Sequence, residues 1–290
     1  MVTAQLTETV LSHEQSDGYR THYRLWGPPN CDDVVVMLHG GMSHSGWQAP
    51  LGAQVGARPG TAFVAVDLRG SGLNEGRGHI PSGERAVEDI TAVVRHLAGS
   101  NRRVHLAGWC FGAQVATVVA ARLAAEDVLA SLIMMSPGFF FNDRYNDVLD
   151  RSVDAALAVV AELDLTPEPT RPYISVPLRP SDFTDRPEWH EFIGNDDLRL
   201  LRVTEATIDA WEEIAIRSET EYAAIGPVPV LAVFGTEDKL VDNGRVREFL
   251  LTHPDVRLHE LRTGHAVHFE DPDAMAGLIA AHIEAGRPGS

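Results

Sequence analysis

The sequence predicts an α/β fold, in which a mostly parallel, doubly wound sheet carries one inserted helical segment. The first observation is that apolar runs of strand length alternate with segments of helical spacing through the first half of the chain. The second is that this alternation stops near residue 139 and resumes near residue 227. Such alternation puts helices on both faces of a parallel sheet. A chain of 290 residues has room for one such domain with an insertion.

Strands are predicted where apolar, β-favouring residues run together between turn signals. The first two strands flank Ser16-Asp17-Gly18, which is typical of a hairpin turn. The run at 34–41 is almost continuously apolar, as expected of a strand that is buried on both faces. In chain order, the predicted strands lie at 7–15, 19–27, 34–41, 61–72, 102–109, 129–137, 228–239 and 256–265.

Helices are predicted between these strands from apolar residues that recur every three or four positions. The segment at 82–99 has one apolar face, with Ser82 as its expected N-cap and Gly99 as its expected end. The other predicted helices of the sheet domain lie at 113–125, 243–253 and 272–285.

Residues 139–226 break the pattern. They contain helical pieces at 153–164 and 196–217, separated by a proline-rich stretch, and no convincing strand. We therefore predict that this segment is a helical lid, inserted into a sheet domain formed by residues 1–138 and 227–290.

The composition argues against several classes of protein. A net charge of −17 disfavours binding to nucleic acid or to anionic membranes. The N-terminal residues have no basic and apolar stretches of a secretory signal, and no apolar run is long enough for a transmembrane helix. Two cysteines, Cys31 and Cys110, are too few for a disulfide framework, so we expect a reduced, cytoplasmic setting.

A candidate nucleophile stands in the stretch Gly-Trp-Cys-Phe-Gly at residues 108–112, between a predicted strand and a predicted helix. This frame is typical of the strand–turn–helix elbow G-x-S-x-G, with Cys110 at the position of the serine. The alternative is that Cys110 is a small core residue, which is the ordinary role of a lone cysteine. We favour the nucleophile because two glycines flank it and three further loops with suitable chemistry accompany it.

Those three loops also follow predicted strands, at the sheet edge where sites form in α/β folds. The loop at 37–47 contains His-Gly-Gly, whose backbone N–H groups can form an oxyanion hole together with the N–H of Phe111. Gly41 or Met42 is the expected second donor, and the pattern does not choose between them.

The other two loops supply an acid and a base. Asp238 follows a strand end and is the expected orienting acid, with Glu237 and Asp242 as alternatives that fit loop charges or helix caps. His265 is the expected base, and His268 is the competing histidine, which we expect to pack on a helix.

Other polar and aromatic motifs are assigned structural roles. Asp67 and Arg69 are expected to brace turns beside the site instead of binding substrate. No metal and no cofactor are expected, because His265, His268 and Glu270 have only loose ligand spacing. The aromatic run at 139–141 fits either lid core or pocket wall.

Several stretches together resemble the α/β-hydrolases, and in particular the lysophospholipase and monoglyceride-lipase-like branch. They cover most of the chain and read LHGGMSHSGW (38–47), DLRGSGLNEGRGH (67–79), GWCFGA (108–113), FTDRPEWHEFIGNDDLR (183–199), GTEDKLVDN (235–243) and GHAVHFED (264–271). The resemblance implies a triad in the chain order Cys110, Asp238, His265. The departure is the cysteine, which is similar to the G-x-C-x-G of dienelactone hydrolases, polyhydroxyalkanoate synthases and bile-acid acyltransferases.

The expected function is acyl transfer through a thioester on Cys110, as in a thioesterase, acyltransferase or cyclase. The expected partner is a small acyl substrate, including carrier-protein and CoA thioesters. One alternative is a carboxylic ester or lactone hydrolase in which cysteine has replaced serine. The other is a non-catalytic protein that binds a small ligand on a hydrolase scaffold.

Overall fold

The computed structural model describes residues 8–99, 102–143, 145 and 173–287. Within these ranges the main sheet has eight strands in the order β1-β2-β4-β3-β5-β6-β9-β10. The strands are β1 (Thr9–Glu14), β2 (Arg20–Trp26), β3 (Asp33–Leu38), β4 (Thr61–Val66), β5 (Arg103–Trp109), β6 (Leu129–Met135), β9 (Val230–Gly235) and β10 (Val256–Leu261).

The pairing confirms a mostly parallel sheet. From β4 to β10 every neighbouring pair is parallel, whereas β2 pairs antiparallel with both β1 and β4. The β1–β2 pair is the hairpin predicted around Ser16-Asp17-Gly18, and Gly18 takes a positive φ of 79° in its turn. Every residue of β3, β4 and β9 is buried, because helices cover both faces of these strands.

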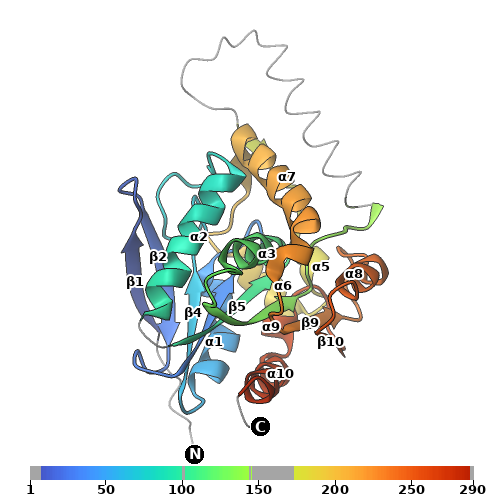
Figure 1. Ribbon diagram of the computed structural model, residues 1–290. Coiled ribbons are helices and arrows are strands. Elements are labelled where there is room, and N and C mark those ends of the chain that lie inside the picture. Colours follow the sequence, from blue (N-terminus) through green and yellow to red (C-terminus); the bar gives the residue numbers. More distant parts are fainter. Residues whose placement is uncertain (1–7, 100–101, 144, 146–172, 288–290) are drawn as a thin grey trace, which may run out of the picture.

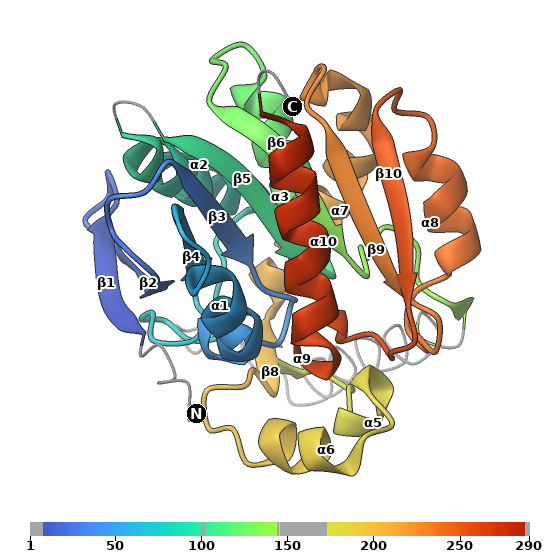
Figure 2. The same ribbon diagram turned by 90° about the horizontal axis from the view of Figure 1, so that it is seen from below.

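Helices lie on both faces of the sheet (Figures 1 and 2). On one face α3 packs against β5 and β6, with α2 beside it and α7 across it, while α1 and α10 pack together on the other face. The helices that belong to this layer structure are α1 (Ala49–Gly56), α2 (Gly83–Ala98), α3 (Phe111–Leu123), α7 (Glu205–Thr220), α8 (Asn243–Leu250) and α10 (Pro272–Ala285).

The ends of α2 are those that the sequence predicts. The hydroxyl of Ser82 accepts a hydrogen bond from the backbone N–H of Arg85 at 3.1 Å, which is an N-cap contact. Gly99 ends the helix with a positive φ of 52°, a conformation that favours glycine.

The segment between β6 and β9 differs in part from the prediction. It contains the helices α5 (Pro180–Phe183), α6 (Pro187–Gly194) and α7, but also two short strands, β7 (Tyr173–Ser175) and β8 (Arg202–Thr204). These strands pair antiparallel in a second small sheet, so the expectation of no strands in this segment is wrong. Three residues are too few to show an alternating pattern, which explains the miss. The helix predicted at 153–164 lies outside the described residues.

Three short helical turns were not indicated by the sequence. They are η1 (Ser45–Gln48), η2 (Tyr222–Ile225) and α9 (Val267–Glu270). Among the described residues, no helix combines the length and the apolar character that a membrane crossing requires.

Candidate active site

Cys110 occupies a sharp turn between β5 and α3. Its backbone has φ 53° and ψ −120°, a combination that residues other than glycine rarely adopt and that costs about 1–3 kcal/mol. Its N–H donates to the carbonyl of Met135 on the neighbouring strand at 3.1 Å, which ties the turn to the end of β6. The geometry is that of a nucleophile elbow, and it places the thiol at the N-terminus of α3.

The glycines on either side of Cys110 are required by close packing. A methyl group on Gly108 would collide with the backbone of Gly112, and one on Gly112 would lie 2.6 Å from the carbonyl oxygen of His39. Strand β5, helix α3 and the loop after β3 therefore approach one another at distances that only glycine permits.

His265 and Asp238 form a buried pair beside the elbow. Nδ1–H of His265 donates to Oδ2 of Asp238 at 2.8 Å, and both side chains are fully buried. The second carboxylate oxygen of Asp238 accepts the backbone N–H groups of Leu240 and Val241, so the acid is held in one orientation. The structure thus joins a histidine and an acid from the loops after two neighbouring strands, β10 and β9.

The other ring nitrogen of His265, Nε2, has no hydrogen-bond partner among the described residues. Burial by itself lowers the pKa of His265, but Asp238 and the nearby thiol of Cys110 outweigh this effect and raise the pKa to about 10. A protonated imidazole beside Cys110 stabilises negative charge on the sulfur, as in a thiolate–imidazolium pair.

The competing acids have other partners. Glu237 pairs with Arg262 at the surface at 3.1 Å. The carboxylate of Asp242 accepts the backbone N–H groups of Gly244 and Arg245, and so caps α8. Of the three acids considered from the sequence, Asp238 is the one that contacts His265.

The competing histidine is buried behind His265. The ring of His268, on α9, packs 4.5 Å from the ring of Trp109, and neither of its nitrogens has a hydrogen-bond partner in the described part of the chain. Burial, assisted by the charge of His265, lowers the pKa of His268 to about 3, so this ring is neutral at ordinary pH. Its position matches the expected packing role.

The predicted oxyanion donors line the same cavity as Cys110. Gly41, Met42 and Phe111 all line the cavity that contains Cys110. Among the described residues, none accepts a hydrogen bond from the backbone N–H of these three, so each N–H is available to a ligand. The contacts leave the choice between Gly41 and Met42 open.

The cavity has a volume of about 620 Å³ and a mainly apolar wall. Part of the wall comes from residues after β6, and Phe141 belongs to it, whereas Phe139 and Phe140 pack on Phe249. The aromatic run at 139–141 is therefore divided between pocket and core. The apolar lining residues are Met42, Trp109, Phe111, Phe141, Val176, Leu178, Phe183, Ile208, Trp211 and Ala215.

Trp109 is a site residue that the sequence analysis did not assign. Its indole N–H donates to the carbonyl oxygen of His265 at 2.8 Å, and its ring lies 5.3 Å from the histidine ring. Because Trp109 directly precedes Cys110, it links the backbone of the elbow to the histidine loop. The only signal in the sequence is its place inside the G-x-C-x-G frame.

Gln114 and Tyr145 also line the cavity and were not assigned from the sequence. Gln114 interrupts a run of small and apolar residues one turn after Cys110, which is the signal that could have found it. Tyr145 follows an unpatterned stretch and offers no comparable signal.

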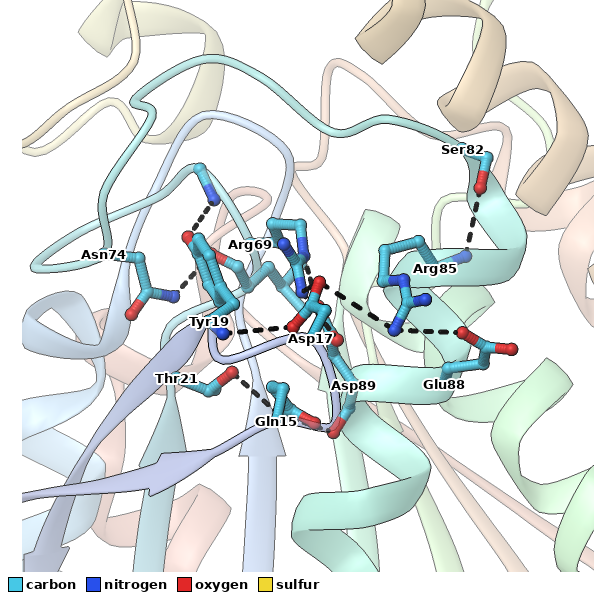
Figure 3. Close-up of polar contacts among 12 residues, drawn as sticks. Gln15, Asp17, Tyr19, Thr21, Arg69, Asn74, Ser82, Arg85, Glu88 and Asp89 are labelled. Carbon is cyan, nitrogen blue, oxygen red and sulfur yellow. Dashed lines mark hydrogen bonds and ion pairs between the residues drawn. The ribbon is translucent and has the colours of Figure 1, made fainter.

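Asp67 and Arg69 make structural contacts near the site, as expected. The carboxylate of Asp67 accepts the backbone N–H of Ser45 at 2.7 Å, which supports the loop after β3 that contains Gly41 and Met42. Arg69 is buried and pairs with Asp89 at 2.6 Å and with Asp17 at 2.9 Å, while its guanidinium lies over the ring of Tyr19 (Figure 3). Arg69 therefore ties the loop after β4 to the hairpin turn and to α2.

Comparisons with known proteins identify the family and the fold. The family model described as serine aminopeptidase, S33, matches residues 29–272. No curated protein matches the sequence. The fold is that of the α/β-hydrolases, because solved structures of such enzymes superpose over nearly the whole chain.

Three solved structures illustrate the similarity. A soluble variant of monoglyceride lipase from Saccharomyces cerevisiae, in complex with a substrate analogue, is 15% identical with a TM-score of 0.82, covering 99% of this chain and 97% of that chain. The monoacylglycerol lipase of Paleococcus ferrophilus is 21% identical with a TM-score of 0.69, covering 90% and 99%. The thioesterase domain from the curacin biosynthetic pathway is 19% identical with a TM-score of 0.63, covering 95% and 99%.

Proposed function

Because the chain belongs to the serine aminopeptidase S33 family of α/β-hydrolases, we propose that it is an acyl-transfer enzyme with a Cys110–His265–Asp238 triad. The observation that carries this proposal is the position of Cys110 in a strained turn at the start of α3, beside a buried histidine whose other ring nitrogen is bonded to Asp238. A structural cysteine has no need of a positive φ, of an adjacent base or of an orienting acid.

In the first half of the reaction, the Cys110 thiolate attacks the carbonyl carbon of an acyl thioester or activated ester. The carbonyl electrons move to oxygen, where N–H groups of Phe111 and of Gly41 or Met42 stabilise the negative charge. Collapse of this intermediate breaks the bond to the leaving group, which takes the proton from His265. The product is an acyl group in thioester linkage to Cys110.

In the second half, water or an amine attacks this thioester. His265, now neutral, accepts the proton that the nucleophile loses, and Asp238 stabilises the resulting imidazolium. The carbon–sulfur bond then breaks, and the Cys110 thiolate returns beside the protonated histidine. The acceptor therefore determines whether the overall reaction is hydrolysis or transfer.

A cysteine favours transfer more than a serine does. The acyl-enzyme is a thioester, which amines and carbanions attack more readily, relative to water, than they attack an ester. The exchange between a thioester substrate and the Cys110 thiol is also close to balanced in free energy. The mainly apolar cavity above Cys110 suits the acyl chain of such a donor.

Hydrolysis of a carboxylic ester or lactone is the second candidate. The family match and the superposition on two lipases favour it. In this case cysteine has replaced serine without a change of reaction, and Cys110→Ser should improve ester hydrolysis. A dedicated thiol enzyme should instead lose activity in the same variant.

Intact mass spectrometry tests the proposal. The protein is mixed with a panel of acyl thioesters and aryl esters, with and without an amine. We expect a covalent adduct on the parent protein and none on Cys110→Ala. In His265→Ala the adduct should form more slowly. Cys31→Ser, which removes the other cysteine, should react like the parent protein. An adduct that amine clears faster than water supports transfer, and equal clearance supports hydrolysis. Normal turnover by Cys110→Ala would exclude the mechanism.

A further inference from the structure

Gln114 and Tyr145 are uncharged polar side chains that line the cavity without a hydrogen-bond partner among the described residues, and the indole N–H of Trp211 is a third unpaired group in the same wall. Gln114, on α3, is only 3% exposed, and none of the hydrogen bonds of the described residues reaches its amide group. Tyr145 also lines the cavity, and its hydroxyl is equally unpaired within the described part of the chain. Burial raises the pKa of Tyr145 well above its ordinary value, so the hydroxyl keeps its proton and can donate.

Buried polar side chains are nearly always hydrogen-bonded within the protein. Gln114 is buried as a residue and Tyr145 is partly buried, and the polar atoms of neither are sealed off from the cavity. A ligand that displaces water from the cavity without replacing its hydrogen bonds would leave these groups unpaired, which costs free energy. The rest of the described wall is mainly apolar. A ligand that enters the cavity is the natural partner for both groups.

The charges of the wall restrict the chemistry of this ligand. Glu212 is the one acidic side chain among the described lining residues, and neither lysine nor arginine is among them. A carboxylate or phosphate placed away from His265 would therefore find no lysine or arginine in the described wall and would lie near Glu212. The expected partner of Gln114 and Tyr145 is a neutral oxygen atom.

The position of Gln114 indicates where on the ligand this oxygen lies. Gln114 is three residues after Phe111 on α3, so these two residues lie one turn apart on the same side of the helix, and Cys110 directly precedes them in its non-helical turn. Side chains at this spacing are separated by about 5–6 Å at Cβ. An acyl carbonyl held at the N–H of Phe111 then places the next carbons of its chain within reach of the Gln114 amide.

We propose that the cavity selects neutral acyl groups that carry a second oxygen close to the reacting carbonyl, as in 3-oxoacyl and 3-hydroxyacyl thioesters. Gln114 is the residue that recognises this oxygen, and Tyr145 is its second donor. This inference rests on the proposed acyl transfer, and it adds the substrate class to it. A plain alkyl chain fills the same space but leaves Gln114 desolvated and unpaired.

A pair of model substrates that differ by one oxygen provides the test. The N-acetylcysteamine thioesters of acetoacetate and butyrate have equally long chains, and release of the thiol is followed by chromatography. We expect kcat/KM to be about 10- to 100-fold higher for acetoacetyl than for butyryl, the range that one unsatisfied buried polar group produces. The succinyl thioester, which adds a carboxylate, should react more slowly than either.

Gln114→Leu keeps the size of the side chain and removes the amide. We expect this variant to lose most of the preference for acetoacetyl over butyryl, measured as the ratio of the two kcat/KM values, because the side chain can no longer bond to the second oxygen. Gln54→Leu, the same substitution at an exposed glutamine on α1, should keep the full preference. Tyr145→Phe is the second variant if Gln114→Leu does not fold, and it should reduce the preference several-fold.

The outcomes separate this inference from the proposed function. Equal turnover of acetoacetyl and butyryl thioesters, in a reaction that Cys110→Ala abolishes, would overturn the substrate class and leave acyl transfer standing. An unchanged preference in both Gln114→Leu and Tyr145→Phe would also overturn it. Absence of any Cys110 adduct with either thioester would contradict both proposals.

Discussion

Asp196 provides a quantitative test of how the segment after α6 is attached to the loop that follows β3. Its carboxylate accepts a hydrogen bond from the indole N–H of Trp47 at 2.6 Å and contacts Nε2 of His44 at 2.9 Å. It also accepts the backbone N–H of Leu198 at 3.0 Å. Trp47 is fully buried, and the Asp196 side chain is 15% exposed, so water can replace these contacts only in part.

Two routes give a similar magnitude for Asp196→Asn. Burial by itself raises the pKa of Asp196, but the hydrogen bonds from His44 and Trp47 lower it from 3.8 to about 2. At 1.36 kcal/mol per unit, the charged form contributes about 2 kcal/mol to folding. Hydrogen bonds to a charged group are independently worth about 1.5–3 kcal/mol, and the asparagine keeps only a neutral acceptor. We therefore expect a loss of about 2 kcal/mol at pH 7.

Urea unfolding at several pH values measures this loss. Because the pKa of Asp196 is lowered in the folded state, its contribution is complete above pH 4 and disappears as pH falls through about 2. The difference between the parent protein and Asp196→Asn should thus be constant from pH 7 to 5 and shrink below 4. Asp197→Asn, at the exposed acid next along the chain, should have almost no effect. A cost below about 0.5 kcal/mol at pH 7, or a cost that grows on acidification, would refute the reasoning.

Three further substitutions test other contacts. Arg69→Met leaves the buried carboxylate of Asp89 unpaired and should cost about 3–5 kcal/mol in urea unfolding, so a cost below about 1 kcal/mol would argue against a bracing role. Gly112→Ala introduces a methyl group into space that the backbone of Leu38 and His39 already fills, and it should destabilise the protein by about 3 kcal/mol. An unchanged midpoint of urea unfolding would contradict this close packing. Trp109→Phe removes the indole donor to the carbonyl oxygen of His265 and should slow alkylation of the Cys110 thiol by iodoacetamide. An unchanged rate would show that this contact does not position the histidine.

The elements of the sheet domain could be predicted because their signals are local. The strand at 34–41 is apolar because both of its faces are covered, and the helix at 82–99 shows its cap, its apolar face and its glycine end within one segment. The elbow was recognisable for the same reason, since two glycines and a nucleophilic side chain fall within five consecutive residues. A pattern of this kind does not depend on what the rest of the chain does.

The two short strands β7 and β8 could not be predicted, because each is stabilised by the other. They lie 27 positions apart in the chain, from Ser175 to Arg202, and pair through main-chain hydrogen bonds that leave little trace in side-chain types. The same limit applies to Asp196, whose partners at residues 44 and 47 lie about 150 positions away.

By itself, the sequence determined the fold class, the family resemblance, the frame around Cys110 and a short list of acids and bases. The tertiary structure decided which members of that list meet. Glu237, Asp238 and Asp242 all carry a carboxylate and lie close together in the chain, and the parallel register of β9 and β10 brings one of them to His265. It also decided that Gln114 faces the cavity without a partner, because side-chain neighbours on separate elements are set by packing in three dimensions and not by local sequence.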